Sequence, residues 1–468
     1  MWTGGPDGDE GDGVSEVWPR GVLDLLAAAG GRTVFEDEER HVSGDEMLSM
    51  IWRVAGGLRD SGVGPGDGVA LRVGVDAEAF AAVMGAFVVG ARVSGVRDQK
   101  VPVDSSDLVV DGERVTGWMD TPGRPQEVAG RPGDIARVLW TSGSTGVPKG
   151  CCQTYGSMTA AWAAHPDRWP QAVRRLAERL QRYLVFGSLS SQVMLEYGVL
   201  TLAAGGTLVV ARPPGFPDAI VRHRATASVI TVGKLNQLVR DQRGRPADLS
   251  SLRALMVSGS PLPPGRLAEA IDVLGPVVFH GYGQTETGMI AMLTPPEMTP
   301  GALDSVGRPP VEVQVRDGEI YVRTPAQASH YWNDPAETAA VFVDGWVRTR
   351  DLGAVGDDGL LRLTGRARDV IIVQAEIVYA GAVERVLAAD PAVAEAYVVG
   401  RPDDTTGEAV HAFVVPAVDA TPDPLALTRQ VASALGDNAA PATVTLIERV
   451  PVAPSGKPDK EALKAALV

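Results

Sequence analysis

The sequence predicts an α/β protein with a large layered N-terminal domain of mostly parallel sheets plus a β-rich lobe, and a small mobile α+β lid domain at the C-terminus. Three observations lead to this fold class. Apolar strand patterns alternate with helix-length segments over most of the chain, short alternating strands begin near residue 311, and about 100 residues of mixed character follow Gly365. Alternating strands and helices are typical of parallel sheets covered by helices. A length of 468 residues also favours more than one core.

Hydrophobic spacing predicts the elements of the layered part in order. Apolar residues recur on one helical face over 43–58, with Ser43 as a possible N-cap. A turn-rich stretch at 62–68 precedes a short strand at 69–73 and a helix at 77–89. Further strands are expected at 207–211, 228–232, 252–257 and 276–279, with a helix over 266–274. This alternation predicts a largely parallel sheet.

The C-terminal part of the chain changes character. Strict alternation predicts strands over 311–315 and 319–323, which form the β-rich lobe. After Gly365 we expect a helix near 380–387, strands at 393–399 and 410–415, and a last helix from Asp459. We therefore divide the chain into a flexible, Gly- and acid-rich arm (1–18), a large domain (19–366) and a small C-terminal domain (367–468), with a linker at 365–369.

Charge and composition exclude several function classes. A net charge of −15 argues against nucleic acid and against an anionic membrane surface as partners, and no apolar run approaches the ~20 residues of a membrane span. The N-terminus has neither a basic start nor an apolar stretch, so we expect no secretory signal. The two cysteines, Cys151 and Cys152, are adjacent and lack metal-ligand spacing, which favours a reducing compartment, the cytoplasm.

The most informative stretch is a loop of small and polar residues that follows the apolar run 135–140. It consists of Thr141, Ser142, Gly143, Ser144, Thr145 and Gly146, followed by Lys149. Glycines let backbone N–H groups approach an anion, and the hydroxyls and the ammonium add donors and charge. The loop is not a Walker A motif, because Gly143 and Gly146 are three apart and Gly150 replaces the hydroxyl residue. It predicts polyphosphate binding, with an ordinary Gly/Ser turn as the alternative.

This loop resembles the phosphate-binding motif of the acyl-adenylate-forming superfamily, which holds acyl- and aryl-CoA ligases, nonribosomal adenylation domains and luciferases. Four later segments resemble motifs of the same superfamily, in its order and at its spacings. They are a nucleotide motif at 281–286, a ribose motif at 348–353, a hinge at 365–369 and a C-terminal lysine motif at 454–457. The resemblance covers nearly the whole chain from about residue 34. It implies that 19–366 is an adenylation domain and that ATP and Mg²⁺ are cofactors. It also implies that 367–468 is a mobile lid domain with its hinge near Arg368.

The resemblance implies a role for each nucleotide-binding residue. The loop 141–149 would hold the β- and γ-phosphates. Tyr282 would stack on adenine, Thr285 would bind the α-phosphate, and Glu286 would bind Mg²⁺, a hard cation that takes oxygen ligands. The rest of the second motif completes the nucleotide site: Gly281, Gly283 and Gln284.

The later motifs supply the remaining charges. Asp351 would accept hydrogen bonds from the ribose, and Arg366 would contact ribose or phosphate. Lys457 would bridge the substrate carboxylate and the α-phosphate when the lid closes, because a mobile lid can deliver a cation late. Together with Lys149, these cations would form the local positive site that an acidic protein needs to bind ATP.

The segment after the hinge departs from the family pattern. The family carries a Lys, a Gly and a Pro-x-Glu where this chain has Ile372, Ala375 and 380–382. That Gly lines the pantetheine tunnel in thioester-forming relatives, and a methyl group at Ala375 narrows the path. The acceptor therefore stays open between CoA, the phosphopantetheine of a carrier protein, and an amine or other nitrogen nucleophile. Two smaller departures are Tyr155, where His is common, and Arg350, where Gly is common.

The residues expected around the acid are small and polar. Amino-acid-activating relatives use an Asp that the matching region, 183–200, lacks, which disfavours an α-amino acid. This region offers Ser190, Ser191 and Gln192, and Ser258 with Gly259 would form the other wall. Such a slot favours an aryl acid or a short acid over a long acyl chain, unless these side chains bind loop backbone instead.

The sequence therefore predicts an ATP-dependent ligase. It would activate a small carboxylic acid as acyl-AMP, release pyrophosphate, and transfer the acyl group to CoA or a carrier-protein thiol. An alternative keeps the adenylation but ends in a C–N or N–N bond, or in release of the adenylate. A non-catalytic nucleotide-binding protein is a third interpretation, which the five intact motifs disfavour.

Overall fold

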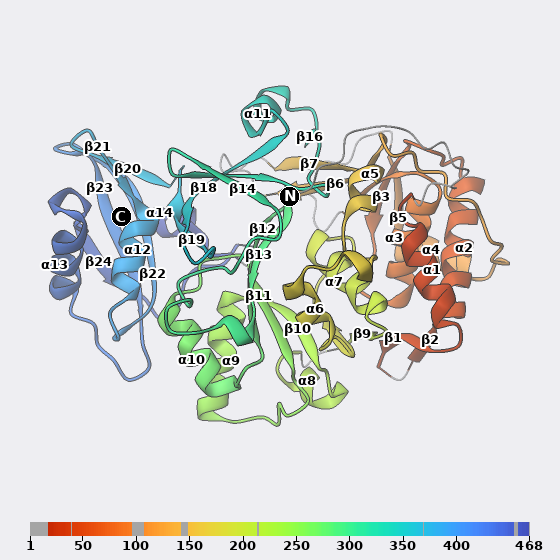
Figure 1. Ribbon diagram of the computed structural model, residues 1–468, viewed down its shortest axis with the longest axis horizontal. Coiled ribbons are helices and arrows are strands. Elements are labelled where there is room, and N and C mark those ends of the chain that lie inside the picture. The colour runs from red at the N-terminus through yellow and green to blue at the C-terminus, as the bar shows by residue number, and fades with distance from the viewer. Residues whose placement is uncertain are drawn as a thin grey trace.

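The computed structural model describes residues 17–38, 40–95, 107–141, 148–212, 215–367, 369–453 and 457–467. Four sheets organise them, three in the large domain and one in the lid. In Figure 1 the lid lies on the left, helices α1 to α4 lie on the right, and most other elements of the large domain lie between them. No helix in these ranges is both long and apolar enough to cross a membrane.

The largest sheet has eight strands in the order β13-β12-β11-β10-β8-β9-β1-β2. Its neighbours are parallel from β12 to β1, and the pairs at the two edges are antiparallel. The strands are β1 (Thr33–Asp37), β2 (Arg40–Ser43), β8 (Arg182–Val185), β9 (Thr207–Val210), β10 (Ala227–Thr231), β11 (Ala254–Ser258), β12 (Val278–Gln284) and β13 (Gly288–Leu293). The mostly parallel sheet predicted from strand–helix alternation is confirmed.

A second sheet has six strands in the order β16-β7-β6-β4-β3-β5. Strands β3 to β6 pair in parallel, whereas β7 runs antiparallel to both β6 and β16. The strands are β3 (Gly68–Arg72), β4 (Arg92–Gly95), β5 (Leu108–Asp111), β6 (Ile135–Thr141), β7 (Lys149–Thr154) and β16 (His330–Tyr331). The apolar run before the phosphate loop is thus β6, a strand inside this sheet.

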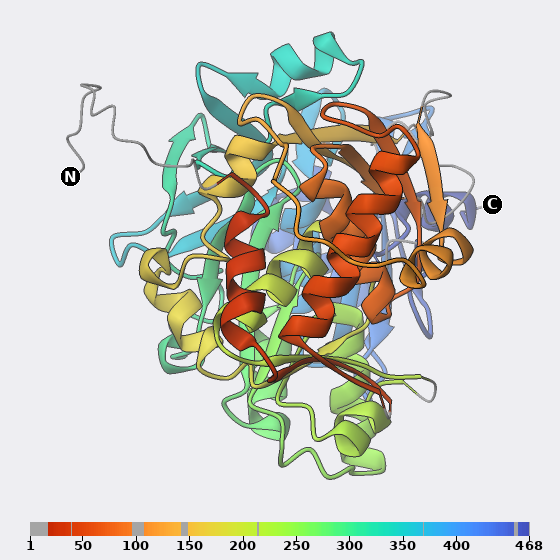
Figure 2. The same ribbon diagram turned by 90° about the vertical axis from the view of Figure 1, so that its right-hand side faces the viewer.

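Helices cover both sheets, and their ends follow the expected capping chemistry. Ser43 begins α2 with a capping box, in which the backbone N–H of Glu46 donates to Ser43 Oγ and the Ser43 N–H donates to the Glu46 carboxylate. Figure 2 shows the first helices, in red, lying across the outer side of the large domain. The helices of the large domain are α1 (Arg20–Ala29), α2 (Gly44–Asp60), α3 (Ala77–Val88), α4 (Gly112–Met119), α5 (Tyr155–Ala160), α6 (Gln171–Ala177), α7 (Gln192–Ala203), α8 (Asp218–His223), α9 (Val232–Gly244), α10 (Pro264–Leu274) and α11 (Pro335–Val341).

The main core lies where helices and sheets meet, and it corrects one predicted boundary. Helix α7 contributes buried residues from most of its circumference, as expected for a helix enclosed by protein. Val17 and Trp18, which we assigned to the flexible arm 1–18, are buried in the same core. Trp18 packs edge-on against Phe87, with ring centroids 5.8 Å apart. The arm was extended too far because its polar composition masked these two apolar residues.

The β-rich lobe is an antiparallel sheet in which β18 pairs with β15, β17 and β19. Its strands are β14 (Glu312–Arg316), β15 (Glu319–Arg323), β17 (Phe342–Val343), β18 (Trp346–Val355) and β19 (Leu361–Arg366). The two strands predicted from alternation are β14 and β15. The long strand β18 carries the ribose motif, and β19 carries the start of the hinge motif.

The lid has its own sheet and its own core. Its elements are β20 (Val370–Val373), β21 (Glu376–Tyr379), α12 (Ala380–Ala388), β22 (Val393–Asp403), β23 (Gly407–Pro416), α13 (Pro424–Leu435), β24 (Thr443–Leu446) and α14 (Lys460–Ala465). Arg266 on α10 donates to the carbonyls of Val393 and Ala394, at 3.0 and 2.9 Å, and Asn236 on α9 donates to Glu395 at 2.8 Å. These bonds hold the lid against the large domain. The predicted hinge residue, Arg368, lies outside the described residues.

Candidate active site

The two ends of the predicted phosphate loop face each other at the edge of the second sheet. Thr141, the last residue of β6, is in register with Lys149, the first residue of β7. The predicted residues between them, Ser142 to Gly146, lie outside the described part of the chain. Lys149 Nζ donates to Glu337 Oε1 at 2.6 Å and lies 5.9 Å from the centre of the Tyr331 ring. The lysine is therefore already held by protein groups.

Glu337 was not expected from the sequence, and it gathers two cations. Arg350 donates to both carboxylate oxygens, at 2.5 and 3.0 Å, beside the bond from Lys149. The hydrogen bonds from Arg350, and to a smaller extent the bond from Lys149, lower the pKa of Glu337 to about 2. Arg350 adopts φ +58°, which a glycine would adopt without strain. Because the chain has Arg350 where the family commonly has Gly, an additional cation reaches Glu337 on α11.

The second and third nucleotide motifs meet at Asp351. Tyr282 Oη and Gln284 Nε2 each donate to Asp351 Oδ2 at 2.6 Å, and Arg366 Nε donates to Asp351 Oδ1 at 3.0 Å. Asp351 is 4% exposed, and its strand pairs directly with Arg366. Burial, together with the charge of Asp351, raises the pKa of the Tyr282 phenol. Residues of three separate motifs, up to 84 positions apart in the sequence, therefore form one hydrogen-bonded cluster.

The second motif lies on a strand and not in a turn. Gly281, Tyr282, Gly283 and Gln284 belong to β12 and pair with β13. A Cβ atom on Gly283 would lie 2.4 Å from the carbonyl oxygen of Gly288, so this position tolerates no side chain. The strand places Thr285 and Glu286 immediately after its end. Parallel sheets commonly bind ligands at this edge.

Glu286 and Lys457 add a carboxylate and an ammonium beside the cluster. Tyr331 Oη donates to Glu286 Oε1 at 2.5 Å, which fixes the carboxylate that we expect to bind Mg²⁺. Burial and the charge of Arg366 lower the pKa of Lys457, while Glu286 and Asp351 act in the opposite direction. Lys457 belongs to the lid, so these mutual effects mean that the lid brings its ammonium close to the residues of the large domain.

The donor set fits a magnesium ion that ATP itself largely coordinates. Within the described ranges, no group of three or more His, Cys, Asp or Glu residues could hold a metal alone. Mg²⁺ beside nucleotide phosphates commonly needs only one or two carboxylates. Glu286 supplies one carboxylate, with one oxygen engaged by Tyr331.

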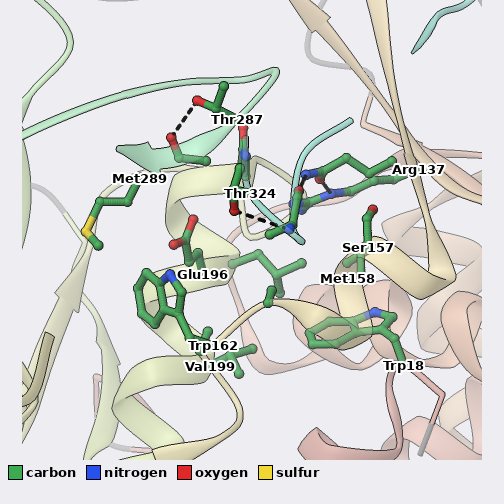
Figure 3. Close-up of a pocket in the computed structure, with 17 residues that line it drawn as sticks. Trp18, Arg137, Ser157, Met158, Trp162, Glu196, Val199, Thr287, Met289 and Thr324 are labelled. Carbon is green, nitrogen blue, oxygen red and sulfur yellow. Dashed lines mark hydrogen bonds between the residues drawn. The ribbon is translucent and has the colours of Figure 1, made fainter. Parts of the chain in front are cut away.

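The residues expected around the acid are only partly brought together. Ser191 caps α7, where its Oγ accepts from the N–H of Met194, and Ser190 Oγ lies 2.7 Å from Ser188 Oγ. Ser258 ends β11, and Gly259 follows it with φ +97°. Gln192 lines a cavity of about 50 Å³, shown in Figure 3, that the sequence did not reveal.

That cavity continues from the end of the second motif. Thr287, Gly288 and Met289 form one wall directly after Thr285 and Glu286. Other walls come from the segment before α1, from β6, β7, α5 and α7, and from the residues after β15. Charged and aromatic side chains point into the space from these elements, among them Trp18, Arg137, Trp162 and Glu196. No sequence motif marks these four residues, because each comes from a different part of the chain.

The two other departures have structural explanations. Tyr155 is fully buried, and its hydroxyl donates to the carbonyl of Ala91 at 2.8 Å, so it closes the core beneath β4. Ala375 lies in the two-residue turn between β20 and β21, with φ +64°. A glycine would adopt this left-handed conformation without strain, so the alanine costs about 1 kcal/mol.

Comparison with known proteins identifies close relatives of this architecture. The AMP-binding enzyme family matches residues 95–332, and the AMP-binding enzyme C-terminal domain matches 382–457. The chain is 31% identical to the fatty acid–[acyl-carrier-protein] ligase ScoC of Streptomyces coeruleorubidus over 90% of both chains. The resemblance drawn from the five motifs is confirmed.

Solved structures extend the likeness to the whole fold. The amide bond synthetase McbA from Marinactinospora thermotolerans is 32% identical, with a TM-score of 0.82 over 95% of this chain and 99% of that one. The o-succinylbenzoate CoA synthetase MenE from Bacillus subtilis, in complex with its acyl-adenylate intermediate, is 27% identical, with a TM-score of 0.76 over 95% and 97%. The same synthetase has been solved with ATP and a magnesium ion.

Proposed function

Because the chain belongs to the AMP-binding enzyme family, we propose that it activates a small carboxylic acid with ATP and passes the acyl group to the thiol of CoA or of a carrier protein. It is an AMP-forming ligase. A carboxylate oxygen of the acid attacks the α-phosphorus of ATP, the bond to the β-phosphate breaks, and pyrophosphate leaves. The acceptor thiol then attacks the acyl carbon and displaces AMP.

One observation carries this proposal: groups from distant motifs converge on one place. Tyr282, Gln284 and Arg366 all bind Asp351, and Lys457 from the lid is electrostatically coupled to Asp351, Arg366 and Glu286. Adenylation brings a carboxylate to an anionic phosphate, so the site must supply positive charge at the place where pyrophosphate departs. This positive charge must already be in position before the reaction begins. Fixed cations around one nucleotide site meet this need.

The roles proposed for the residues are those that the family motifs imply. Asp351 would receive the ribose hydroxyls, and Lys149 would meet the outer phosphates beside the loop. Glu286 would hold Mg²⁺, which would neutralise phosphate charge. Lys457 would lie between the acid and the α-phosphate, and its electrostatic interaction with Glu286 and Asp351 supports this role. Thr285, next to Glu286, would bind the α-phosphate.

The test is exchange of pyrophosphate into ATP with a panel of aryl and short aliphatic acids. We expect exchange that depends on the acid. Lys457→Ala should reduce it by about 10²- to 10³-fold, the usual cost of removing one group that stabilises transition-state charge. ATP affinity should stay within a few-fold, since the other phosphate contacts remain.

A matched control lies in the same domain. Lys464, on α14, pairs only with the exposed Glu461 among its recorded ion pairs, at 3.1 Å. Lys464→Ala should therefore leave exchange unchanged. Exchange that survives in Lys457→Ala would contradict the role of this lysine, and absence of exchange with every acid would contradict adenylation itself.

A second candidate acceptor is an amine. The methyl group of Ala375, held at φ +64°, favours it, because thioester-forming relatives are expected to need a glycine there. The likeness to an amide bond synthetase agrees with this alternative. Incubation with acid, ATP and either CoA or an amine decides between them. Thioester formation in the wild type supports the thiol, whereas amide alone, with thioester gained in Ala375→Gly, supports the amine.

A further inference from the structure

The cavity between β6, α7 and β13 contains two buried hydrogen-bond donors that no described residue satisfies. Arg137 is 7% exposed; its Nε donates to Gln153 Oε1 at 2.6 Å, but its Nη1 is buried without a hydrogen-bond partner. Trp18 is equally buried, and its Nε1 also lacks a partner. Both residues line the same cavity (Figure 3). Buried donors are nearly always paired in native proteins, so these two require an acceptor.

Two neighbouring polar side chains, Gln153 and Glu196, do not supply that acceptor. Gln153 uses its carbonyl oxygen for Arg137 Nε and its amide nitrogen for the carbonyl of Ala326, at 3.2 Å. Glu196 points into the cavity from α7 (Figure 3), but it forms no ion pair within 4.0 Å of Arg137 among the described contacts. An acceptor for both donors would therefore lie in the cavity between Arg137 and Trp18.

The position of the cavity connects it to the reacting centre. Thr287 and Gly288 form its wall and directly follow Thr285 and Glu286, while Gln192 closes the adjoining side. An acid whose carboxylate lies beside Thr285 would extend its other end toward this space. A cavity of about 150 Å³ accepts benzene, so one of about 50 Å³ accepts a tip of a few atoms and not a ring.

Charge restricts the chemistry of that tip. Arg137 contributes a positive charge, and Glu196 contributes a negative one when ionised. A second carboxylate would add another buried charge beside Glu196, whereas a neutral oxygen can accept from the arginine and adds no charge. The cavity therefore suits a carbonyl or hydroxyl oxygen.

We propose that the acid carries a neutral oxygen acceptor at the end remote from its carboxylate, and that Arg137, with Trp18 as a second donor, selects for it in this cavity. The inference rests on the proposed function, because it names the class of acid that the same site would activate. Arg137 acts on specificity and takes no part in the transfer of the acyl group.

The test compares acids that differ only in this oxygen. The probes are 3-(4-hydroxyphenyl)propanoate against 3-phenylpropanoate and 5-oxohexanoate against hexanoate, with adipate as the dicarboxylate. The measurement is kcat/KM for acid-dependent pyrophosphate release. In the wild type we expect the oxygenated acid of at least one pair to be preferred by about 10- to 100-fold, the range for a hydrogen bond to a charged donor. In Arg137→Met this preference should fall to near 1.

Two further variants keep the test independent of folding. Trp18→Phe retains the ring that packs on Phe87 but removes its N–H, so it should reduce the preference part-way. Arg182→Met makes the same chemical change at an arginine that binds Glu36 at 2.8 and 2.6 Å, away from the cavity, and should leave the preference intact. If Arg137→Met does not fold, Trp18→Phe decides.

The possible outcomes distinguish failure of this inference from failure of the proposed function on which it rests. Pyrophosphate release with equal kcat/KM for both members of each pair would overturn the inference and leave the function standing. The same holds for a preference that persists in both Arg137→Met and Trp18→Phe, since water would then satisfy the donors. A preference for adipate would overturn the neutral acceptor. No release with any acid would overturn the function and the inference together.

Discussion

The pH dependence of stability should report the unusual environment of Glu196. Burial raises the pKa of its carboxyl to about 7 from the ordinary 4.5, and the charge of Arg137 opposes this rise without cancelling it. A carboxyl whose pKa is raised on folding binds its proton more tightly in the folded chain. It therefore stabilises the protein fully below pH 4.5, and this stabilisation is lost as pH rises toward 7.

The size of the effect follows from the shift. One pKa unit corresponds to about 1.4 kcal/mol, so the shift accounts for about 3 kcal/mol at most, and for about 2 kcal/mol once solvent in the cavity screens the charge. With an unfolding entropy of about 2 cal/mol/K per residue and about 350 residues in the large domain, this amounts to roughly 3 °C in Tm. Glu196→Gln keeps the shape of the side chain and removes its titration.

The assay is thermal unfolding of both proteins at pH 5, 6, 7 and 8, at one scan rate. Relative to Glu196→Gln, the wild type should lose roughly 3 °C between pH 5 and 8, with little further change above pH 8. Glu178→Gln, at an exposed position on the surface, controls for the loss of one negative charge. A Tm difference between wild type and Glu196→Gln that is constant with pH, or that grows in favour of the wild type as pH rises, would refute the burial argument.

Two other predictions concern the lid and the phosphate loop. Arg266→Ala removes the hydrogen bonds to the carbonyls of Val393 and Ala394 in the lid. Pyrophosphate exchange should therefore slow by a few-fold while the affinity for ATP is retained. An equal loss of exchange and of ATP affinity would point to misfolding instead. Glu337→Gln removes the carboxylate that binds Lys149 and Arg350. Because the two cations then lose an internal partner, KM for ATP should fall and Tm at pH 7 should drop by a few degrees. A raised KM would show that Glu337 positions Lys149 for ATP.

Helices and strands could be predicted wherever one face of the element is buried, because burial imposes a regular spacing of apolar residues along the sequence. Helix α2 and strands β9 and β10 were located within one or two residues, and Ser43 was identified as a cap because its chemistry acts within four residues. Strand β12 was predicted too short. Its glycines resemble a turn, yet Gly283 faces Gly288 at the start of β13 so closely that only glycine fits there.

The candidate site could be predicted in part, for a related reason. Asp351, Arg366 and Glu286 were predicted because ordered motifs carry them; the structure brings the first two within hydrogen-bond distance, and their roles stay predictions. Glu337 was missed because its segment shows nothing more than a helix start after Asp334. Ser191, expected around the acid, caps α7, a local need that the sequence cannot distinguish from ligand binding, and its contact with the acid stays a prediction.

Charge compensation explains how a strongly acidic chain keeps a site for a polyphosphate. Four cations gather here, Lys149, Arg350, Arg366 and Lys457, facing three carboxylates, Glu286, Glu337 and Asp351. Without nucleotide the cations are largely neutralised, which avoids the cost of a cluster of like charges. If ATP with Mg²⁺ binds here as proposed, it exchanges internal partners for phosphates, and its affinity then reflects the difference between two sets of ion pairs and not their sum. The carboxylates of the site therefore set its affinity as much as its lysines do.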